Sequence, residues 1–248
     1  MTISTPVEEL RALTRREAGG LAATENLRVL ELLRSLRDDD WSKPTECPAW
    51  DVRAMAAHVL GGMEAFASVR QFVHQMRAGS KAKGDGPFID GMTAVQVRER
   101  ADLSRDQLLE RVAAVGPRVA RARVRVPRPL RWMPMKEEVG GVPETWRMGY
   151  LLDVILTRDT WMHRVDIARA TGREMFLTVD HDGRLIADVV AEWARRHGQQ
   201  FVLHLEGPAG GTFTKGGGEE ITIDAVEFCR ILSGRATGAG LLIQEVPF

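Results

Sequence analysis

The segment RDTWMHRVDIARATG, residues 158–172, places two polar side chains where an apolar row should continue. Asp159 and His163 fall on the helical stripe that the neighbouring apolar residues assign to the core. A buried carboxylate is costly without a partner, so Asp159 needs a cation, a hydrogen-bond donor or a metal ion. The four-residue spacing brings the two Cβ atoms to about 5–6 Å, which suits two ligands of one ion.

A structural role explains the same pair without a metal. Asp159 could accept a hydrogen bond from the imidazole of His163, or it could pair with an arginine such as Arg53. Polar pairs also occur in cores that have no functional role, so the spacing alone favours this structural interpretation. A third donor is needed to favour a metal site.

His58 is a third potential donor, on a helix predicted over about residues 51–77. Gly61 and Gly62 follow on the same side, and each glycine inside a helix costs about 1 kcal/mol relative to alanine. They therefore indicate either the close approach of another helix or space for a ligand beside His58. The remaining histidines have no partner at ligand spacing and are not candidates: His74, His181, His197 and His204.

The elements that must position these residues are mostly helices. Apolar spacing predicts helices over residues 6–38, 51–77, 92–123 and 145–171, with a kink or break at Gly116-Pro117 and a loop over 124–143. Asp51 is a suitable N-cap, Ser104 and Gln107 have capping-box spacing, and Gly172 is a suitable residue to end the last helix. Four such helices predict an up-down bundle.

The apolar pattern changes after Gly172. A helix is predicted over about 181–197, ending at Gly198, and alternation in QFVLHLEG and EEITID predicts strands. The segment DAVEFCRILSG predicts a final short helix. The expected fold class is therefore α+β, with a helical bundle over residues 1–172 and a small α+β domain over 173–248.

Composition limits the functional classes. The chain has 248 residues, 44% of them hydrophobic, and Lys plus Arg and Asp plus Glu both total 34, so no net charge favours nucleic acid or an anionic membrane. Six arginines between residues 118 and 131 lack the aromatic residues of a nucleic-acid site and suit a solvated edge or pairing with the acidic 137–144 segment. The two cysteines form no metal-finger motif, and no apolar leader or long apolar span occurs, so a cytoplasmic protein is expected.

Two stretches together resemble a known family. The stretch WSKPTECPAWDVRAMAAHVLGG, followed about 100 residues later by RDTWMHRVDIARATG, is similar to the mycothiol-dependent maleylpyruvate isomerase family, whose N-terminal domain is a DinB/YfiT-like metal-binding bundle. The ending ITIDAVEFCRILSGRATGAGLL, followed by EVPF, resembles the C-terminal α+β domain of that family, which is sterol-carrier-like. The resemblance covers nearly the whole chain.

The resemblance implies that His58, Asp159 and His163 bind a divalent metal ion, with zinc expected. The characterised isomerase type has Glu at the position of Asp159, so this side chain is one methylene shorter. Two histidines and one carboxylate leave a coordination position open for water or a thiolate. The family implies mycothiol as the thiol, which adds to the cis double bond of maleylpyruvate and is eliminated after rotation. Arg235 matches a family arginine that would contact a substrate carboxylate, although it could equally cap the preceding helix.

Asp166 and Cys47, which lie near these residues, each have two possible roles. Asp166 could orient the imidazole of His163, but a salt bridge to Arg164 or Arg169 is the preferred expectation. Cys47 precedes a helix, where a thiol can be activated, yet the surrounding Pro and Trp residues favour a packed turn.

The functional hypothesis is a metal-dependent enzyme that uses a low-molecular-weight thiol, of the maleylpyruvate isomerase or thiol S-transferase type. Its expected partners are mycothiol and a small-molecule substrate, without nucleic acid or membrane. One alternative is a metal-dependent hydrolase, in which the open position holds hydroxide. Another is a module that binds a ligand without turnover.

Overall fold

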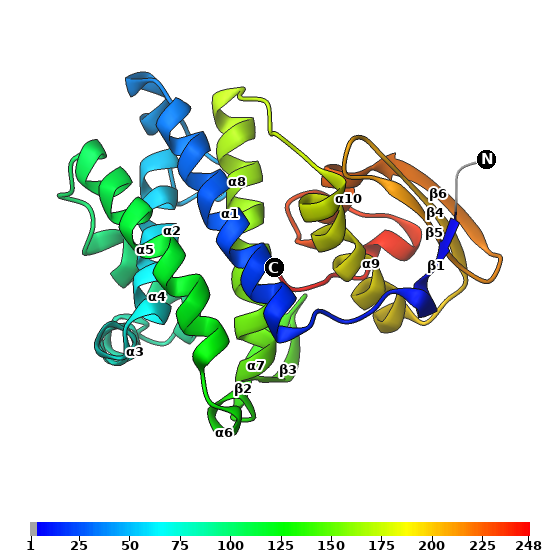
Figure 1. Ribbon diagram of the computed structural model, residues 1–248, viewed down its shortest axis with the longest axis horizontal. Coiled ribbons are helices and arrows are strands. Elements are labelled where there is room, and N and C mark those ends of the chain that lie inside the picture. Colours follow the sequence, from blue (N-terminus) through cyan, green and yellow to red (C-terminus); the bar gives the residue numbers. More distant parts are fainter. Residues whose placement is uncertain (1–3) are drawn as a thin grey trace. The chain divides into compact units, whose positions relative to one another are not determined.

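The computed structural model describes residues 4–248, which form two compact units (Figure 1). The bundle unit comprises Arg15–Leu130 and Asp159–Met175. The mixed unit comprises the described residues up to Thr14, together with Arg131–Arg158 and Phe176–Phe248. The predicted α+β fold class is confirmed. The domain boundary expected at residue 172 stays a prediction.

Six helices of more than ten residues build the bundle unit, and four of them share its core. The helices are α1 (Arg15–Ser35), α2 (Val52–Ala67), α3 (Val69–Ala82), α4 (Phe88–Arg98), α5 (Arg105–Arg125) and α8 (Leu156–Thr171). Their shared apolar core contains Leu33 from α1, Met55 from α2, Leu108 from α5 and Ile167 from α8. Each of these four side chains is fully buried. These four helices correspond to the predicted four-helix bundle, and α3 and α4 are separate helices that overlap the predicted ranges 51–77 and 92–123.

Several helix ends follow the signals in the sequence. Asp51 accepts a hydrogen bond from the backbone N–H of Ala54 at 2.7 Å, so it is the N-cap of α2. Ser104 and Gln107 form the predicted capping box at the start of α5. Gly172, which follows α8, has φ 67°, a left-handed conformation that favours glycine.

The expected helix lengths in the bundle unit are wrong in three places. Residues 6–38 are α-helical only over Arg15–Ser35, because Pro6 ends strand β1 and Val7–Glu9 form a short 3-10 helix. The helix expected over 51–77 breaks at Ser68, whose side chain caps α3 by accepting from the backbone N–H of Gln71. The region 92–123 divides between Arg98 and Arg105, and Pro117 stays inside α5.

The segment expected as a loop over 124–143 is partly regular. It contains a short helix, α6 (Arg128–Arg131), and the hairpin of β2 (Pro134–Val139) with β3 (Val142–Arg147). Gly140 and Gly141 make its turn with φ 55° and 78°, the pair of positive values that a tight hairpin turn requires. The helix expected from residue 145 starts later, with α7 (Met148–Tyr150), a π-helical turn over Leu151–Ile155, and then α8.

The mixed unit contains a four-stranded sheet with the order β1-β5-β4-β6. Its strands after β1 are β4 (Phe201–Glu206), β5 (Gly211–Lys215) and β6 (Glu219–Asp224), and its later helices are α9 (Arg184–His197) and α10 (Ala225–Leu232). Strand β4 pairs antiparallel with β5 and parallel with β6, while β1 pairs parallel with β5. Trp193 packs edge-to-face on Phe201 and Phe228 at centroid distances of 4.7 and 5.3 Å. The predicted strands β4 and β6 and the predicted helices α9 and α10 are confirmed.

No helix in the described part of the chain has both the length and the apolar character needed to cross a lipid bilayer.

Gly61 allows close helix approach, one of the two reasons proposed for the glycines of α2. A Cβ on Gly61 would lie 2.6 Å from Cβ of Gln96 on α4. The carbonyl of Gly61 also accepts a hydrogen bond from Nε2 of Gln75 at 3.0 Å, and Oε1 of Gln75 accepts from Gln96 at 2.9 Å. A Cβ on Gly62 would have no atom within 4 Å. Gly61 therefore allows α2 to approach α4 closely, whereas Gly62 faces open space.

This difference makes a matched pair of variants. We expect Gly61→Ala to lower the free energy of unfolding by about 1–3 kcal/mol, because Gln96 and its buried amide pair must move. We expect Gly62→Ala to raise it by about 0.5–1 kcal/mol, because alanine restricts the unfolded chain and meets open space. Urea unfolding of both variants measures these changes. Equal effects of the two substitutions would contradict the assigned helix contact.

Candidate metal centre

The structure brings together three side chains that the sequence singled out. His58 lies on α2, and Asp159 and His163 lie one turn apart on α8. Nε2 of His163 is 3.3 Å from Oδ1 of Asp159, and Nε2 of His58 is 3.7 Å from Oδ2. One donor atom from each residue can be chosen so that all three lie within 4.8 Å of one another. Two imidazole nitrogens thus face the two oxygens of one carboxylate.

Asp166 orients the imidazole of His163. Its Oδ2 lies 3.1 Å from Nδ1 of His163, and the carboxylate is fully buried. The expected salt bridge to Arg169 is not formed, since Arg169 pairs with Glu46, whereas a salt bridge to Arg164 stays a prediction. A carboxylate that accepts the Nδ1 proton leaves Nε2 with its lone pair, which is the arrangement found behind histidine ligands of metals.

His58 is held by ring packing. The indole of Trp50 stacks on its imidazole with a centroid distance of 4.7 Å, and the ring of His163 meets it edge-on at 4.9 Å. Nδ1 of His58 is buried without a hydrogen-bond partner among the described residues. Arg53, considered above as a partner for Asp159, instead donates to the backbone carbonyls of Ala101 and Leu103, the former at 2.9 Å.

The turn that carries Trp50 is the packed turn predicted around Cys47. The hydroxyl of Thr45 donates to the carbonyl of Trp50 at 2.8 Å and accepts from the backbone N–H of Cys47 at 3.2 Å. The N–H of Trp50 closes the turn on the carbonyl of Cys47 at 2.9 Å. Sγ of Cys47 then lies 4.0 Å from Oδ2 of Asp166. The P-T-x-C-P-x-W motif therefore places one residue against His58 and another against the carboxylate behind His163.

Charge pairing shifts two pKa values at this site. Burial acts to raise the pKa of Asp159, but the charge of His163 and the contacts with both histidines outweigh it and hold that pKa well below its usual range. Burial acts to lower the pKa of His163, but the carboxylates of Asp159 and Asp166 outweigh it and raise the pKa to about 9. The carboxylate is thus neutralised by an imidazolium, and a divalent cation would satisfy the same oxygens.

The donor set fits a divalent ion with an open position. Two imidazoles and one carboxylate are the ligands of many catalytic zinc sites, and nickel, iron and manganese also accept them. The side chains of His58 and His163 are 10% and 6% exposed, whereas that of Asp159 is 34% exposed. The carboxylate is therefore the most exposed of the three side chains.

Residues 22–168 match a known domain family. A model of the mycothiol maleylpyruvate isomerase N-terminal domain matches residues 22–168, which is more than half of the chain. The chain belongs to this domain family. All three residues of the candidate centre lie inside the stretch that matches the maleylpyruvate isomerase domain. A comparison with curated proteins gave no match.

Two solved structures are similar to this member of the family over nearly all of both chains. One is the crystal structure of the mycothiol-dependent maleylpyruvate isomerase, with 16% identity and a TM-score of 0.55, covering 95% of this chain and 94% of that chain. The other is a histidine-to-alanine mutant of that isomerase, also with 16% identity and a TM-score of 0.55, covering 94% and 93%. At this level of identity the likeness shows a shared fold.

Arg235 lies outside the matched domain and in the mixed unit. Its backbone N–H donates to the carbonyl of Arg230 at 2.9 Å, and Gly234 before it has φ 77°, so the two residues end α10. Its expected contact with a substrate carboxylate stays a prediction.

Of two further residues that shape the centre of this maleylpyruvate isomerase domain, Trp50 was not predicted from the sequence and Asp166 was considered as an orienting residue but not preferred in that role. Trp50 was quoted within a motif, but no spacing rule links it to His58 across the start of α2. Asp166 stands three residues after His163, which is the spacing of side chains on one helix face. That spacing was the available signal for its orienting role.

Proposed function

We propose that this protein is an enzyme in which His58, Asp159 and His163 bind a divalent metal ion next to the thiol of mycothiol. Zinc is the proposed ion. The proposed reaction is of the maleylpyruvate isomerase or thiol S-transferase type. The observation that carries it is the approach of two imidazole Nε2 atoms to one carboxylate, at 3.3 and 3.7 Å. Membership of the maleylpyruvate isomerase domain family supports mycothiol as the thiol.

The roles of the chain's own residues follow from their contacts. Asp166 would hold the proton of His163 at Nδ1, so that Nε2 can offer its lone pair once a metal ion replaces the Nε2 proton of the imidazolium. Trp50 covers one face of His58 and limits the rotation of its ring. Asp159 faces both histidines although it is one methylene shorter than Glu, which supports its role as the third ligand.

The metal ion explains why a thiol would be used here. When bound, zinc lowers the pKa of a coordinated thiol, which then becomes a nucleophilic thiolate at neutral pH. The low exposure of both histidines excludes bulk water from two sides of the centre. The more exposed side chain of Asp159 leaves the third side open to the thiol and to a small substrate.

Cobalt substitution tests this proposal, because Co²⁺ takes zinc ligands and has a visible spectrum. We expect the full chain to bind Co²⁺, and mycothiol to add an intense sulfur-to-cobalt absorption band. Mycothiol methylated on sulfur is the matched control, since it cannot form a thiolate. The zinc-loaded protein should then isomerise maleylpyruvate, or transfer mycothiol to an electrophile, only when the free thiol is present.

Two negative results of this experiment would overturn different parts of the proposal. Failure to bind Co²⁺ or Zn²⁺ would overturn the metal centre and favour a module that binds a ligand without turnover. Cobalt binding with no effect of mycothiol would overturn the thiol assignment and favour a hydrolase that uses metal-bound water.

A further inference from the structure

Helix α3 of the bundle unit carries an apolar row on its solvent side. Val69, Val73 and Met76 follow one another at spacings of four and three residues, which places their side chains along one line of the helix. These residues are 81%, 38% and 38% exposed. The buried residues of α3 are Gln75 and Gly79, which contact α2 and α4 on another side of the helix. The apolar row is therefore left to solvent.

The spacing of this row is that of helices that pack side by side. Val69 and Met76 are seven residues apart with Val73 between them, so the three fill successive d, a and d positions of a heptad. Arg70 and Arg77 directly follow the two d residues and fill e positions. Side chains at e positions lie beside the apolar seam and select the partner helix by charge. On α3 these selecting positions are cationic.

The cations beside the apolar row have no anionic partner. Arg70, Arg77 and Lys81 line one shallow hollow together with Val69 and Val73. In the part of the chain that the structure describes, none of these three cations pairs with a carboxylate. Helix α3 itself, VRQFVHQMRAGSKA, contains no acidic residue. This face of the bundle unit thus combines exposed apolar surface with uncompensated positive charge.

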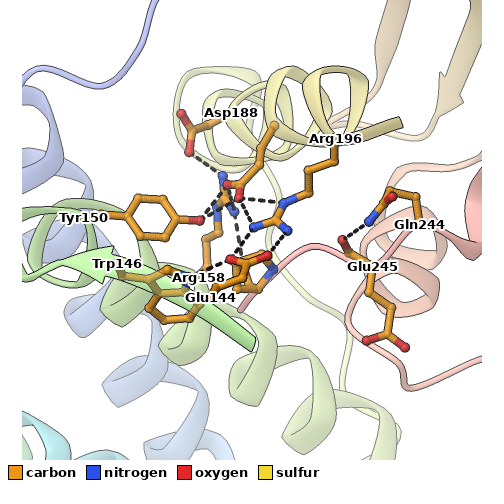
Figure 2. A network of polar contacts seen from close by, with 10 residues as sticks. Glu144, Trp146, Tyr150, Arg158, Asp188, Arg196, Gln244 and Glu245 are labelled. Carbon is orange, nitrogen blue, oxygen red and sulfur yellow. Dashed lines mark hydrogen bonds and ion pairs between the residues drawn. The ribbon is translucent and has the colours of Figure 1, made fainter. Parts of the chain in front are cut away.

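Two arginines of the mixed unit illustrate the paired state that α3 lacks. Arg158 contacts Oδ2 of Asp188 at 2.7 Å. Arg196 contacts Oε1 of Glu144 at 2.5 Å. Figure 2 shows both guanidinium groups directed at these carboxylates. The exposed cations of α3 are instead available to carboxylates of another molecule.

We propose that α3 is a docking helix for another protein, and that the docked segment is an amphipathic helix with acidic residues beside its apolar row. The apolar row of such a helix would cover Val69, Val73 and Met76, which removes their apolar surface from water. Its carboxylates would lie opposite Arg70 and Arg77, where charge complementarity selects the partner. This site is separate from the candidate metal centre and does not depend on a bound ion.

Two other occupants fit this face less well. A second copy of α3 would bring the same cationic row to the interface, and like charges that face each other across an interface are unfavourable. A lipid surface suits helices that present Trp, Phe or Leu on their apolar side. The exposed row of α3 contains two valines and one methionine instead. Charge and side-chain type together favour an acidic helix of a partner protein.

Fluorescence anisotropy with the purified full chain and a labelled synthetic peptide tests this proposal. The probe is a helical peptide of three heptads with Leu at the a and d positions and Glu at the e and g positions, used below the concentration at which it self-associates. A matched peptide carries Lys in place of Glu. We expect the Glu peptide to bind at least about 10-fold more tightly than the Lys peptide. Val73→Ser should weaken binding of the Glu peptide by about 10-fold, because the centre of the apolar contact is lost.

Charge reversal gives the matched pair of variants. Arg70→Glu combined with Arg77→Glu should invert the preference, so that the Lys peptide binds more tightly. Arg118→Glu combined with Arg121→Glu makes the same change of charge at exposed residues of α5 and should leave the preference for the Glu peptide intact.

Four results would overturn the proposal. Equal binding of the two peptides would remove the charge selection, and parental binding in Val73→Ser would remove the apolar contact. Binding to phosphatidylglycerol vesicles that Val73→Ser abolishes would assign this face to lipid. A dimer of the full chain that Val73→Ser dissociates would assign it to a second copy.

Discussion

Replacing His163 with alanine is expected to lower zinc affinity by more than about 100-fold. The loss of a residue behind a metal ligand costs about 10- to 100-fold, and the loss of a ligand itself exceeds this. His163 offers Nε2 at 3.3 Å from the carboxylate of Asp159 and is also the residue that Asp166 orients. Its removal therefore takes away one donor and leaves two carboxylates without their imidazole partner. Competition with a chromophoric chelator measures the change in affinity.

The controls for this variant address folding and specificity. His74→Ala removes a half-exposed histidine that pairs with Glu99 on the surface of the bundle unit, so it should keep parental zinc affinity. His163→Gln fills most of the ring volume but lacks the imidazole nitrogens, so it should lose zinc while keeping a cooperative thermal transition. Parental zinc affinity in folded His163→Gln would remove His163 from the ligand set.

Replacing Asp166 with asparagine is expected to lower zinc affinity by about 10- to 100-fold while all three proposed ligands remain. The substitution keeps the shape of the side chain and removes the charge that accepts the Nδ1 proton of His163 at 3.1 Å. The neutral amide holds that proton less strongly, and it can also turn its NH₂ group toward the ring. Both effects leave Nε2 a weaker ligand.

Cys47→Ala is the matched control, because it removes another neighbour of Oδ2 of Asp166, at 4.0 Å. A thiol at this distance is a weak donor, so we expect zinc affinity to change by less than about 3-fold, below the cost of losing an orienting carboxylate. Zinc affinity is measured for both variants, with Tm as the check on folding. The comparison separates the orientation of the His163 ring from an effect on general packing. Similar losses in the two variants would argue against the orienting role of Asp166.

Local signals predicted the parts of the fold that depend on nearby residues. Asp51, Ser104 and Gly172 act within a few residues along the chain, and each of their predicted helix ends is present. Ser68 was overlooked because the apolar period continues across it, although serine is a strong N-cap. Strand β1 could not be found locally, since Ser4–Pro6 become a strand only by pairing with β5, more than 200 residues later.

The same distinction holds at the candidate centre. Asp159 and His163 were predicted to lie side by side because helical spacing alone determines their distance. The orienting role of Asp166 was considered but not preferred, because the pairing of Arg169 with Glu46 joins residues more than 100 positions apart in sequence. The contact of Trp50 with His58 likewise needed the folded turn before α2.

The origin of the three donors on two distant helices also matters for the folding of the bundle unit. Asp159 and His163 are neighbours in any helical form of their segment, but His58 lies about 100 residues earlier. An ion shared by all three acts as a cross-link that closes a loop of that length, and cross-links of long loops remove conformational freedom from the unfolded chain. With the proposed ion bound, ion affinity and folding free energy would be linked quantities, so supply of the metal would affect how firmly α2 and α8 stay together.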